Sequence, residues 1–183
     1  MAVREILVYE KDKDTLRKRS KPIAEVDQDV KDLIQDLKDT LDASGDGIGL
    51  AAPQIGAHHR VVLVRFSAEG EEGEEQAGPP IALINPKIVE ARDGRKDFDG
   101  CLSFPGLFGE TNRPHYLRLT GLYENGEPFD EIITGFDAVV VHHEIDHLNG
   151  VLFIDRIDDP NDLYRVRKNE EGELERVPAE MPQ

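Results

Sequence analysis

The sequence predicts a fold of the α+β class, on three observations. Residues 27–43 repeat apolar side chains at the three- and four-residue steps of an amphipathic helix. The apolar segment from Phe136 to Phe153 predicts a second, buried helix. Short alternating segments indicate strands, and Asn125-Gly126 between two of them is typical of a hairpin turn.

The N-terminal third is predicted to contain one helix. Residues 3–8 indicate a short strand or an extended segment, and the polar, basic residues 9–24 a loop. Asp27 or Asp29 can cap the following helix, and Gly45 can end it. Its apolar stripe consists of Val30, Leu33, Ile34, Leu37 and Leu41.

The middle of the chain alternates between glycine-rich and strand-like segments. Four glycines in residues 45–56 allow close backbone approach to a ligand. A strand is predicted over residues 60–66, and residues 67–80 form an acidic stretch with Gly and Pro that is predicted to be a mobile loop. Further strands are predicted over residues 81–86, 87–91, 116–123 and 129–133.

The second helix is predicted to begin between Thr134 and Asp137 and to end at Asn149-Gly150, where glycine takes the left-handed position. Residues 164–183 form a variable tail, in which a small hairpin and a frayed end are equally compatible with the pattern. With no linker or repeat in its 183 residues, the chain is predicted to be a single catalytic domain, 1–183.

Composition and charge exclude several classes of function. The formal net charge is −16, which disfavours direct nucleic-acid binding because phosphates would be repelled. No apolar run reaches the length of a membrane span, and the N-terminus lacks the features of a signal or transit peptide. We therefore expect a cytoplasmic protein without a membrane partner.

His143-Glu144-Ile145-Asp146-His147 predicts a catalytic metal site. On a helix, residues four apart lie on one face, so both imidazoles can bind the same ion. Glu144 would then lie near the ion's water as a general base.

A catalytic site of this kind needs a third protein ligand. Apart from the many carboxylates, the candidates are Cys101, His58, His59, His115 and His142. Cys101, the only cysteine, follows Gly100 in a turn-like setting that favours it, although a lone cysteine is often a buried core residue.

Three blocks resemble the signature motifs of peptide deformylases, in the family's order and at similar spacing. They are Gly47-Ile48-Gly49-Leu50-Ala51-Ala52-Pro53-Gln54, Gly100-Cys101-Leu102-Ser103, and His143-Glu144-x-Asp146-His147-Leu148-x-Gly150. The resemblance extends loosely over residues 3–158 and implies a fold with antiparallel sheets around a central helix that bears the His-Glu-x-x-His run.

The resemblance also implies a function and a set of roles. Members of the family remove the formyl group from the N-terminal formyl-methionine of nascent proteins. Cys101, His143 and His147 would hold one divalent metal, with Fe²⁺ expected in the cell and Zn²⁺, Ni²⁺ or Co²⁺ in purified protein. Glu144 would be the general acid and base, and Gln54 with the backbone N–H of Leu102 would stabilise the oxyanion. The expected partners are N-formylmethionyl nascent peptides, and contact with the ribosome is left open.

The substrate slot is predicted from size and polarity. A formyl group is small, so a site crowded by the Gly47–Gly49 backbone could exclude larger acyl groups; Gly49 and Gly100 are expected among the substrate-binding residues. An apolar slot for methionine could be formed by Ile48, Val139, Val140 and Phe136, for each of which ordinary core packing is an equally good explanation.

The sequence departs from the family's pattern at two positions. Asp99 and His142 stand where Glu and Gln are common. Asp99 keeps the negative charge on a shorter side chain, so its hydrogen-bond partners are not predicted. His142 is expected on a neighbouring helix face, with a role beside the metal ligands as the alternative. Asp146 resembles an acidic position beside the ligands and could pair with Arg113; a solvated surface pair is the alternative. The family's long C-terminal helix is absent.

Two other functions compete with this one. A zinc endopeptidase would take its third ligand downstream of the helix, but no histidine follows His147. A deformylase-like protein that binds without turnover would be expected to lack Glu144, Gln54 or a ligand, and all are present.

Overall fold

A computed structural model describes residues 2–69 and 75–183 and has the α+β architecture that the sequence predicts. Its helices are α1 (Tyr9–Leu16), α2 (Gln28–Ala43) and α3 (Gly135–Leu148), with short 3-10 helices η1 (Ala52–Ile55), η3 (Phe153–Arg156) and η4 (Pro160–Asp162). Its strands are β1 (Gly49–Ala51), β2 (Val61–Glu69), β3 (Glu75–Gly100), β4 (Leu107–Leu122), β5 (Pro128–Thr134), β6 (Leu163–Lys168) and β7 (Leu174–Pro178).

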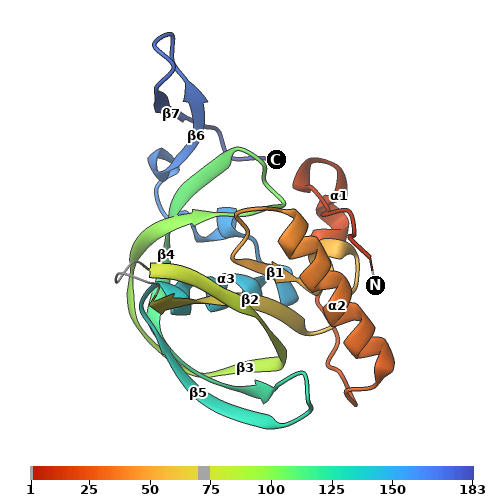
Figure 1. Cartoon of the computed structure of the whole chain (residues 1–183). Helices are drawn as coiled ribbons and strands as arrows, with labels where there is room; N and C mark the ends of the chain where they lie inside the picture. The colour runs from red at the N-terminus through yellow and green to blue at the C-terminus, as the bar shows by residue number, and fades with distance from the viewer. Residues whose placement is uncertain (1, 70–74) are drawn as a thin grey trace.

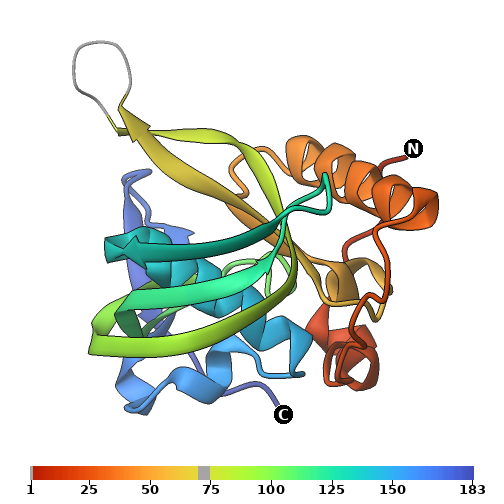
Figure 2. The same ribbon diagram turned by 90° about the horizontal axis from the view of Figure 1, so that it is seen from below.

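The strands form one antiparallel sheet that curves around α3. The strand order is β1-β2-β3-β4-β6-β7, and β5 also pairs with β4. Figure 1 shows α3 inside the curve of the long strands, and Figure 2 shows the same strands from below, with α2 on the other side. The helix with the predicted metal ligands is therefore the centre of the fold.

Strand β2 divides the core because its side chains alternate between two faces. Val62 and Val64 pack with α3 residues such as Val141 and Ile145. Val61 and Leu63 pack on the opposite side. There they meet the apolar stripe of α2, which includes Ile34, Leu37 and Leu41. A sheet buried on both faces holds β1 and α3 at a fixed separation.

Both predicted helices are confirmed, together with their caps. The Asp27 carboxylate accepts a hydrogen bond from the Val30 N–H at the start of α2. Helix α3 ends at Leu148, and Gly150 follows with a φ of +71°. The predicted turn at Asn125-Gly126 is also present, with Gly126 at a φ of +82°.

The prediction of a loop over residues 9–24 is wrong for α1. This helix has no continuous apolar stripe, because only Tyr9 and Leu16 are buried. The Tyr9 ring stacks on Phe104, and Leu16 belongs to the same core cluster. Tertiary packing at the two ends stabilises a helix that its own pattern does not reveal. Residues 3–8 are extended and join no sheet.

The predicted acidic loop is also wrong at both of its ends. Strand β2 continues through residues 67–69, and β3 begins at residue 75 and pairs with it. These strand ends are held by backbone hydrogen bonds rather than by apolar burial, which is why polarity alone did not reveal them. The central part of the predicted loop, residues 70–74, lies outside the described residues.

Strands β3 and β4 are longer than the sequence predicts. The two predicted strands over residues 81–91 are parts of β3, which continues to Gly100, and β4 begins at Leu107 rather than near residue 116. In the added part of β4 burial alternates regularly, but the buried face carries the polar residues Thr111, Arg113 and His115, so hydrophobicity does not reveal the alternation.

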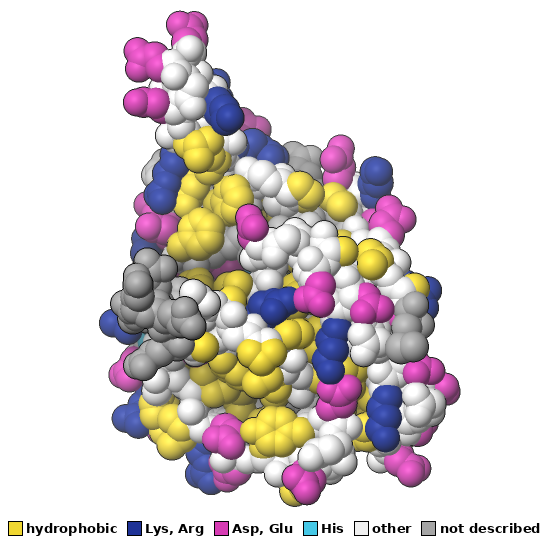
Figure 3. Space-filling view, viewed as in Figure 1, with side chains coloured by type: hydrophobic (Ala, Val, Ile, Leu, Met, Phe, Trp, Pro, Cys, Tyr) yellow, Lys and Arg dark blue, Asp and Glu magenta, His cyan; other side chains and the backbone are white. Residues whose placement is uncertain are grey.

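The C-terminal tail forms the hairpin that was one of two predicted alternatives. Strands β6 and β7 pair from Tyr164↔Pro178 to Lys168↔Leu174. The hairpin projects from the body of the molecule, and hydrophobic side chains run along the face seen in Figure 3. Over residues 2–69 and 75–183, no helix has both the length and the apolar character that a membrane crossing requires.

Gly150→Ala is expected to lower the free energy of unfolding by about 2–4 kcal/mol. A Cβ at Gly150 would lie 2.1 Å from the carbonyl oxygen of Arg17, and the residue has a positive φ. Gly126→Ala is the matched control, because Gly126 also has a positive φ but nothing lies within 4 Å of its added Cβ. Urea unfolding measures the free energy of unfolding of both variants. An equal decrease in the two variants would exclude a contribution from the clash at Gly150.

Candidate metal centre and active site

Helix α3 brings two imidazoles to one point. His143 and His147 lie one turn apart, and their Nε2 atoms are 3.2 Å from each other. Both residues are buried, at 7% and 1% exposure. The helix is surrounded by apolar contacts, so its rotation about its axis is fixed by packing and both rings must face the same side.

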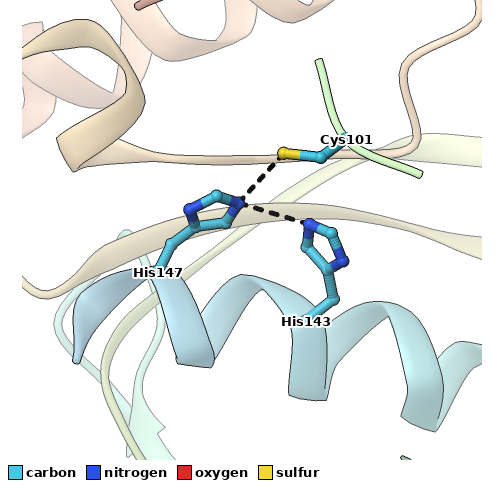
Figure 4. A group of neighbouring side chains, drawn as sticks. All are labelled: Cys101, His143 and His147. Carbon is cyan, nitrogen blue, oxygen red and sulfur yellow. Dashed lines mark hydrogen bonds between the residues drawn. The ribbon is translucent and has the colours of Figure 1, made fainter. Parts of the chain in front are cut away.

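Cys101 reaches this point from the end of β3 (Figure 4). Its Sγ lies 3.4 Å from His147 Nε2, and within the described residues these three side chains are the one group whose donor atoms all lie within 4.8 Å of one another. The turn that carries Cys101 is held by the Phe104 N–H, which donates to the Cys101 carbonyl, and by the Tyr9 N–H, which donates to Ser103.

The donor set fits a divalent cation. A tetrahedral site with usual Zn–S and Zn–N lengths has N···N and S···N edges of about 3.3 and 3.6 Å, close to the 3.2 and 3.4 Å found here. His143 Nδ1 lies 2.7 Å from Asp99, so the carboxylate fixes the tautomer that leaves Nε2 free to bind. Two imidazole nitrogens and a sulfur that face one point need either protons or a cation between them, and their chemistry suits a divalent cation.

A buried ion-pair network supports the ligands from behind. Arg113 is fully buried, and its Nε donates to Asp99 at 2.8 Å while its Nη1 donates to Asp146 at 2.7 Å. Thr111 donates a further hydrogen bond to Asp99, and Arg156 donates two to Asp146. The suggested Asp146–Arg113 pair is thus confirmed, and as a buried pair rather than a solvated one.

The charges of this network explain several pKa shifts. Burial opposes ionisation of Asp99, but His143 and Arg113 outweigh it and hold its pKa well below the usual range. Burial likewise opposes charge on His143, but Asp99 raises the pKa of this histidine well above its usual value. Burial and the adjacent His143 lower the pKa of His147.

His142 lies on a neighbouring face of α3, as predicted, but it is not isolated. Its Nδ1 lies 2.8 Å from Nη1 of Arg113, so the neutral ring accepts a hydrogen bond. Burial lowers the pKa of His142 to about 4, which keeps the ring in this accepting form. His142 is therefore a third hydrogen-bond acceptor for Arg113, beside Asp99 and Asp146.

Glu144 lies at the floor of the site against β1. The residue is 4% exposed, and burial raises the pKa of its carboxyl to about 7. A Cβ added at Gly49 would lie 2.6 Å from Oε1 of Glu144. Only glycine allows β1 and the Glu144 side chain to approach this closely.

Gln54 points its amide nitrogen toward the centre. Its Oε1 accepts from the Ala51 N–H at 2.9 Å, which fixes the amide orientation, and its Nε2 donates to Ser103 Oγ at 3.1 Å. The same Nε2 lies 3.6 Å from Cys101 Sγ. Leu102, the next residue, lines the same cavity.

A cavity of about 620 Å³ opens beside these residues. Every site residue predicted from the sequence lines it except His147, which lies beneath its floor. The predicted substrate residues in its lining are Ile48, Gly49, Gly100, Val139 and Val140, together with Phe136. The other candidate ligands lie elsewhere: His58 contacts Thr15, and His115 contacts Asp97 and the Arg113 backbone.

Sequence reasoning missed an aromatic part of the cavity wall. Phe98 and Phe108 stack at a centroid distance of 5.6 Å, and Phe104 lies nearby in the lining. A longer prediction for β3 and β4 would have found the first two, because Phe98 and Phe108 then lie on the same face as Gly100. The contact of Arg156 with Asp146 was not predicted, because no sequence pattern places the short 3-10 helix η3 against α3.

A Cys-His-His donor set with both histidines buried, beside a buried glutamate and an oriented amide, defines a metallohydrolase site. Comparison with known proteins identifies the family. The sequence model of the polypeptide deformylase family matches residues 3–162, so the chain belongs to this family.

Relatives and solved structures agree with the family match. The chain is 38% identical to a peptide deformylase of Alkalilimnicola ehrlichii, over 91% of this chain and 87% of the relative. It is 39% identical to a peptide deformylase of Thermomicrobium roseum, over 96% of this chain and 97% of the relative. A peptide deformylase structure from Thermotoga maritima superposes with a TM-score of 0.75 at 36% identity, over 87% and 100%. A peptide deformylase structure from Ehrlichia chaffeensis in complex with actinonin superposes with a TM-score of 0.77 at 36% identity, over 87% of this chain and 91% of that one.

Asp99→Asn is expected to weaken metal binding roughly 10- to 100-fold, because the amide no longer holds the His143 ring as a carboxylate does. Asp99→Glu keeps the charge and should restore part of the affinity. Asp97→Asn is the control, since Asp97 is half-exposed and contacts His115 instead. Competition against a chelator measures the three affinities, and an Asp99→Asn value equal to that of Asp97→Asn would contradict the assignment.

Proposed function

We propose that this protein is a metal-dependent hydrolase that removes the formyl group from the N-terminal formyl-methionine of newly synthesised proteins and releases formate. Membership of the polypeptide deformylase family supports this activity. The observation that carries it is the convergence of Cys101, His143 and His147 beside the buried Glu144, at the edge of a cavity narrowed by the Gly49 backbone.

Cys101, His143 and His147 would hold one divalent cation, and we propose Fe²⁺ as the metal in the cell, with Zn²⁺, Ni²⁺ or Co²⁺ able to occupy the same ligands. When bound, such a cation supplies Lewis-acid chemistry and brings the pKa of water toward neutrality. A thiolate together with two neutral imidazoles suits a borderline metal ion better than Mg²⁺ or Ca²⁺, which prefer oxygen ligands.

Glu144 is proposed to move the proton. Its carboxylate accepts a proton from the attacking water as the new C–O bond forms at the formyl carbon. It then delivers that proton to the amide nitrogen as the C–N bond breaks, so that formate and a free methionine amine result. A pKa raised to about 7 by burial suits a group that must both accept and give a proton near neutral pH.

Gln54 and Leu102 are proposed to stabilise the oxyanion. Gln54 Nε2 is aimed at the centre because its Oε1 is already engaged by Ala51. Leu102 follows Cys101 directly and lines the same cavity, and its backbone N–H is the second donor in this proposal. A preorganised donor of this kind lowers the barrier by about 3–4 kcal/mol.

The cavity lining supports selection for formyl-methionine. The close approach of Gly49 to Glu144 is proposed to crowd this side of the site and so to disfavour acyl groups larger than formyl. Ile48, Phe136, Val139 and Val140 offer an apolar wall for the methionine side chain, and Gly100 lets the Phe108 ring pack closely at the cavity wall.

The competing functions explain less of the site. A zinc endopeptidase would leave Cys101 and the orientation of Gln54 without a role. A binding protein without turnover would have no need of a buried carboxyl at Glu144. We place the reaction in the cytoplasm, where nascent formylated chains emerge, and contact with the ribosome stays a prediction from sequence.

Protein loaded with Fe²⁺ or Ni²⁺ is expected to release formate from formyl-Met-Ala-Ser, and to lose this activity when a chelator removes the metal. Formate dehydrogenase coupling measures the product, and re-addition of metal should restore the rate. Acetyl-Met-Ala-Ser is the control substrate, which the narrow acyl site should reject. Absence of formate from the fully loaded protein would contradict the proposal.

Glu144→Gln is expected to retain the metal but to lower kcat by about 10²- to 10⁴-fold, because the amide cannot carry the proton. Glu131→Gln, on the exposed face of β5, is the matched control and should leave kcat unchanged. Metal content is determined on the same samples. A near-normal kcat for Glu144→Gln at full metal content would remove Glu144 as the proton carrier.

A further inference from the structure

We propose that the β6–β7 hairpin is a docking surface for the substrate polypeptide downstream of its formyl-methionine. This inference rests on the proposed function, since it extends the path of the same substrate. The occupant is the unfolded nascent chain, bound through apolar side chains about five to eight residues after the methionine.

The hairpin lies beyond the residues that the family model matches. The family match ends at residue 162, and β6 begins at Leu163. The hairpin is nevertheless joined to the catalytic sheet, because β6 pairs with the start of β4 from Leu107↔Arg165 to Gly109↔Leu163. Its position relative to the cavity is therefore set by backbone hydrogen bonds.

The strand register makes one continuous face from the cavity to the hairpin. Gly100 pairs with Phe108, and Phe108 pairs with Tyr164, so these three residues lie on the same side of the sheet. The rings of Phe98, Phe108 and Tyr164 follow one another at centroid distances of 5.6 and 6.3 Å. Phe98 and Phe108 line the cavity itself, so the aromatic row begins inside the site.

Beyond Tyr164, the same face carries exposed apolar side chains. Val166 is two residues further along β6 and is 38% exposed, and Leu174 on β7 is 71% exposed. Alternation along the strands, with Val166 opposite Arg176 and Leu174 opposite Lys168, puts both on the Tyr164 face. Phe98, at the cavity rim, is 46% exposed. Figure 3 shows hydrophobic side chains continuing from the body of the molecule onto the hairpin.

The reach of this face sets the length of the bound segment. From Gly100 across β4 to Tyr164 is two strand spacings, about 10 Å, and from Tyr164 to the level of Lys168 and Leu174 is about 13 Å. An extended peptide covers this path with about seven residues. A tripeptide therefore ends near the aromatic row, whereas a chain of eight or nine residues reaches Val166 and Leu174.

Charge favours a polypeptide over nucleic acid as the occupant. The docking face carries the cations Lys168 and Arg176, and the Arg176 guanidinium lies over the Tyr164 ring at 4.3 Å. The turn of the hairpin, however, carries the acidic residues Glu170, Glu171 and Glu173, in a chain of net charge −16. Phosphate backbones would be repelled there, whereas an unfolded chain offers apolar side chains and the carboxylates that the two cations can pair with.

The test compares substrate lengths on matched variants. The double variant Val166→Thr/Leu174→Thr removes the exposed apolar surface, and threonine is still a residue that strands accept. Val177→Thr is the control, because it makes the same kind of change on the opposite face of the hairpin. For formyl-Met-Ala-Ser, kcat/KM should be equal in all three proteins. The second substrate is a formylated nonapeptide with Leu and Phe at positions six and eight. The unmutated protein and Val177→Thr should show a kcat/KM for the nonapeptide roughly tenfold higher than for the tripeptide, and only the double variant should lose this difference.

Fluorescence anisotropy of the labelled nonapeptide measures docking independently of turnover, and sedimentation velocity measures self-association. Equal kcat/KM for the tripeptide and nonapeptide in the natural sequence would overturn the proposal, as would an equal loss in Val177→Thr. Self-association that only the double variant abolishes would instead identify a second copy as the occupant. Hairpin-dependent binding without formate release from either peptide would overturn the proposed function and leave the docking surface intact.

Discussion

The buried guanidinium of Arg113 is the constraint on which the site depends. It joins Asp99, at the end of β3, to Asp146 on α3, and so ties the strand that delivers Cys101 to the helix that carries both histidines. Removing either carboxylate would leave the buried guanidinium with one anionic partner instead of two, and breaking a buried ion pair typically costs about 3–5 kcal/mol. The donor atoms of three residues from two elements therefore keep their relative positions before any metal arrives.

The sheet acts on the same site from the other side. Because β2 packs against α3 on one face and α2 on the other, β1 is held where Gly49 touches Glu144. The proposed proton carrier, acyl site and metal-binding histidines are then positioned by core packing rather than by flexible loops. Rigid elements of this kind give the preorganisation on which oxyanion stabilisation depends.

Sequence alone predicted the features that local patterns encode. Each of these features depends on residues only a few positions apart in the chain. They are the apolar stripe of α2, the cap at Asp27, the glycine after α3 and the four-residue spacing of His143 and His147. It missed what depends on distant contacts: helix α1 is stabilised by packing of Tyr9 and Leu16, and the ends of β3 and β4 are set by pairing to each other. The links from Arg113 to Asp99 and Asp146 span 14 and 33 residues. The Asp146 pair was suggested from the family resemblance, whereas no local pattern indicated the contacts of Asp99 or Arg156.

The central claim is that Cys101, His143 and His147 hold one metal ion with a position left open for reaction. X-ray absorption at the metal edge of protein loaded with one equivalent of Zn²⁺ tests it most directly. The account predicts one sulfur at about 2.3 Å and two imidazole nitrogens at about 2.0–2.1 Å, with a light atom completing the shell, and loss of the sulfur contribution in Cys101→Ser. A shell of nitrogen and oxygen alone in the natural sequence would contradict it.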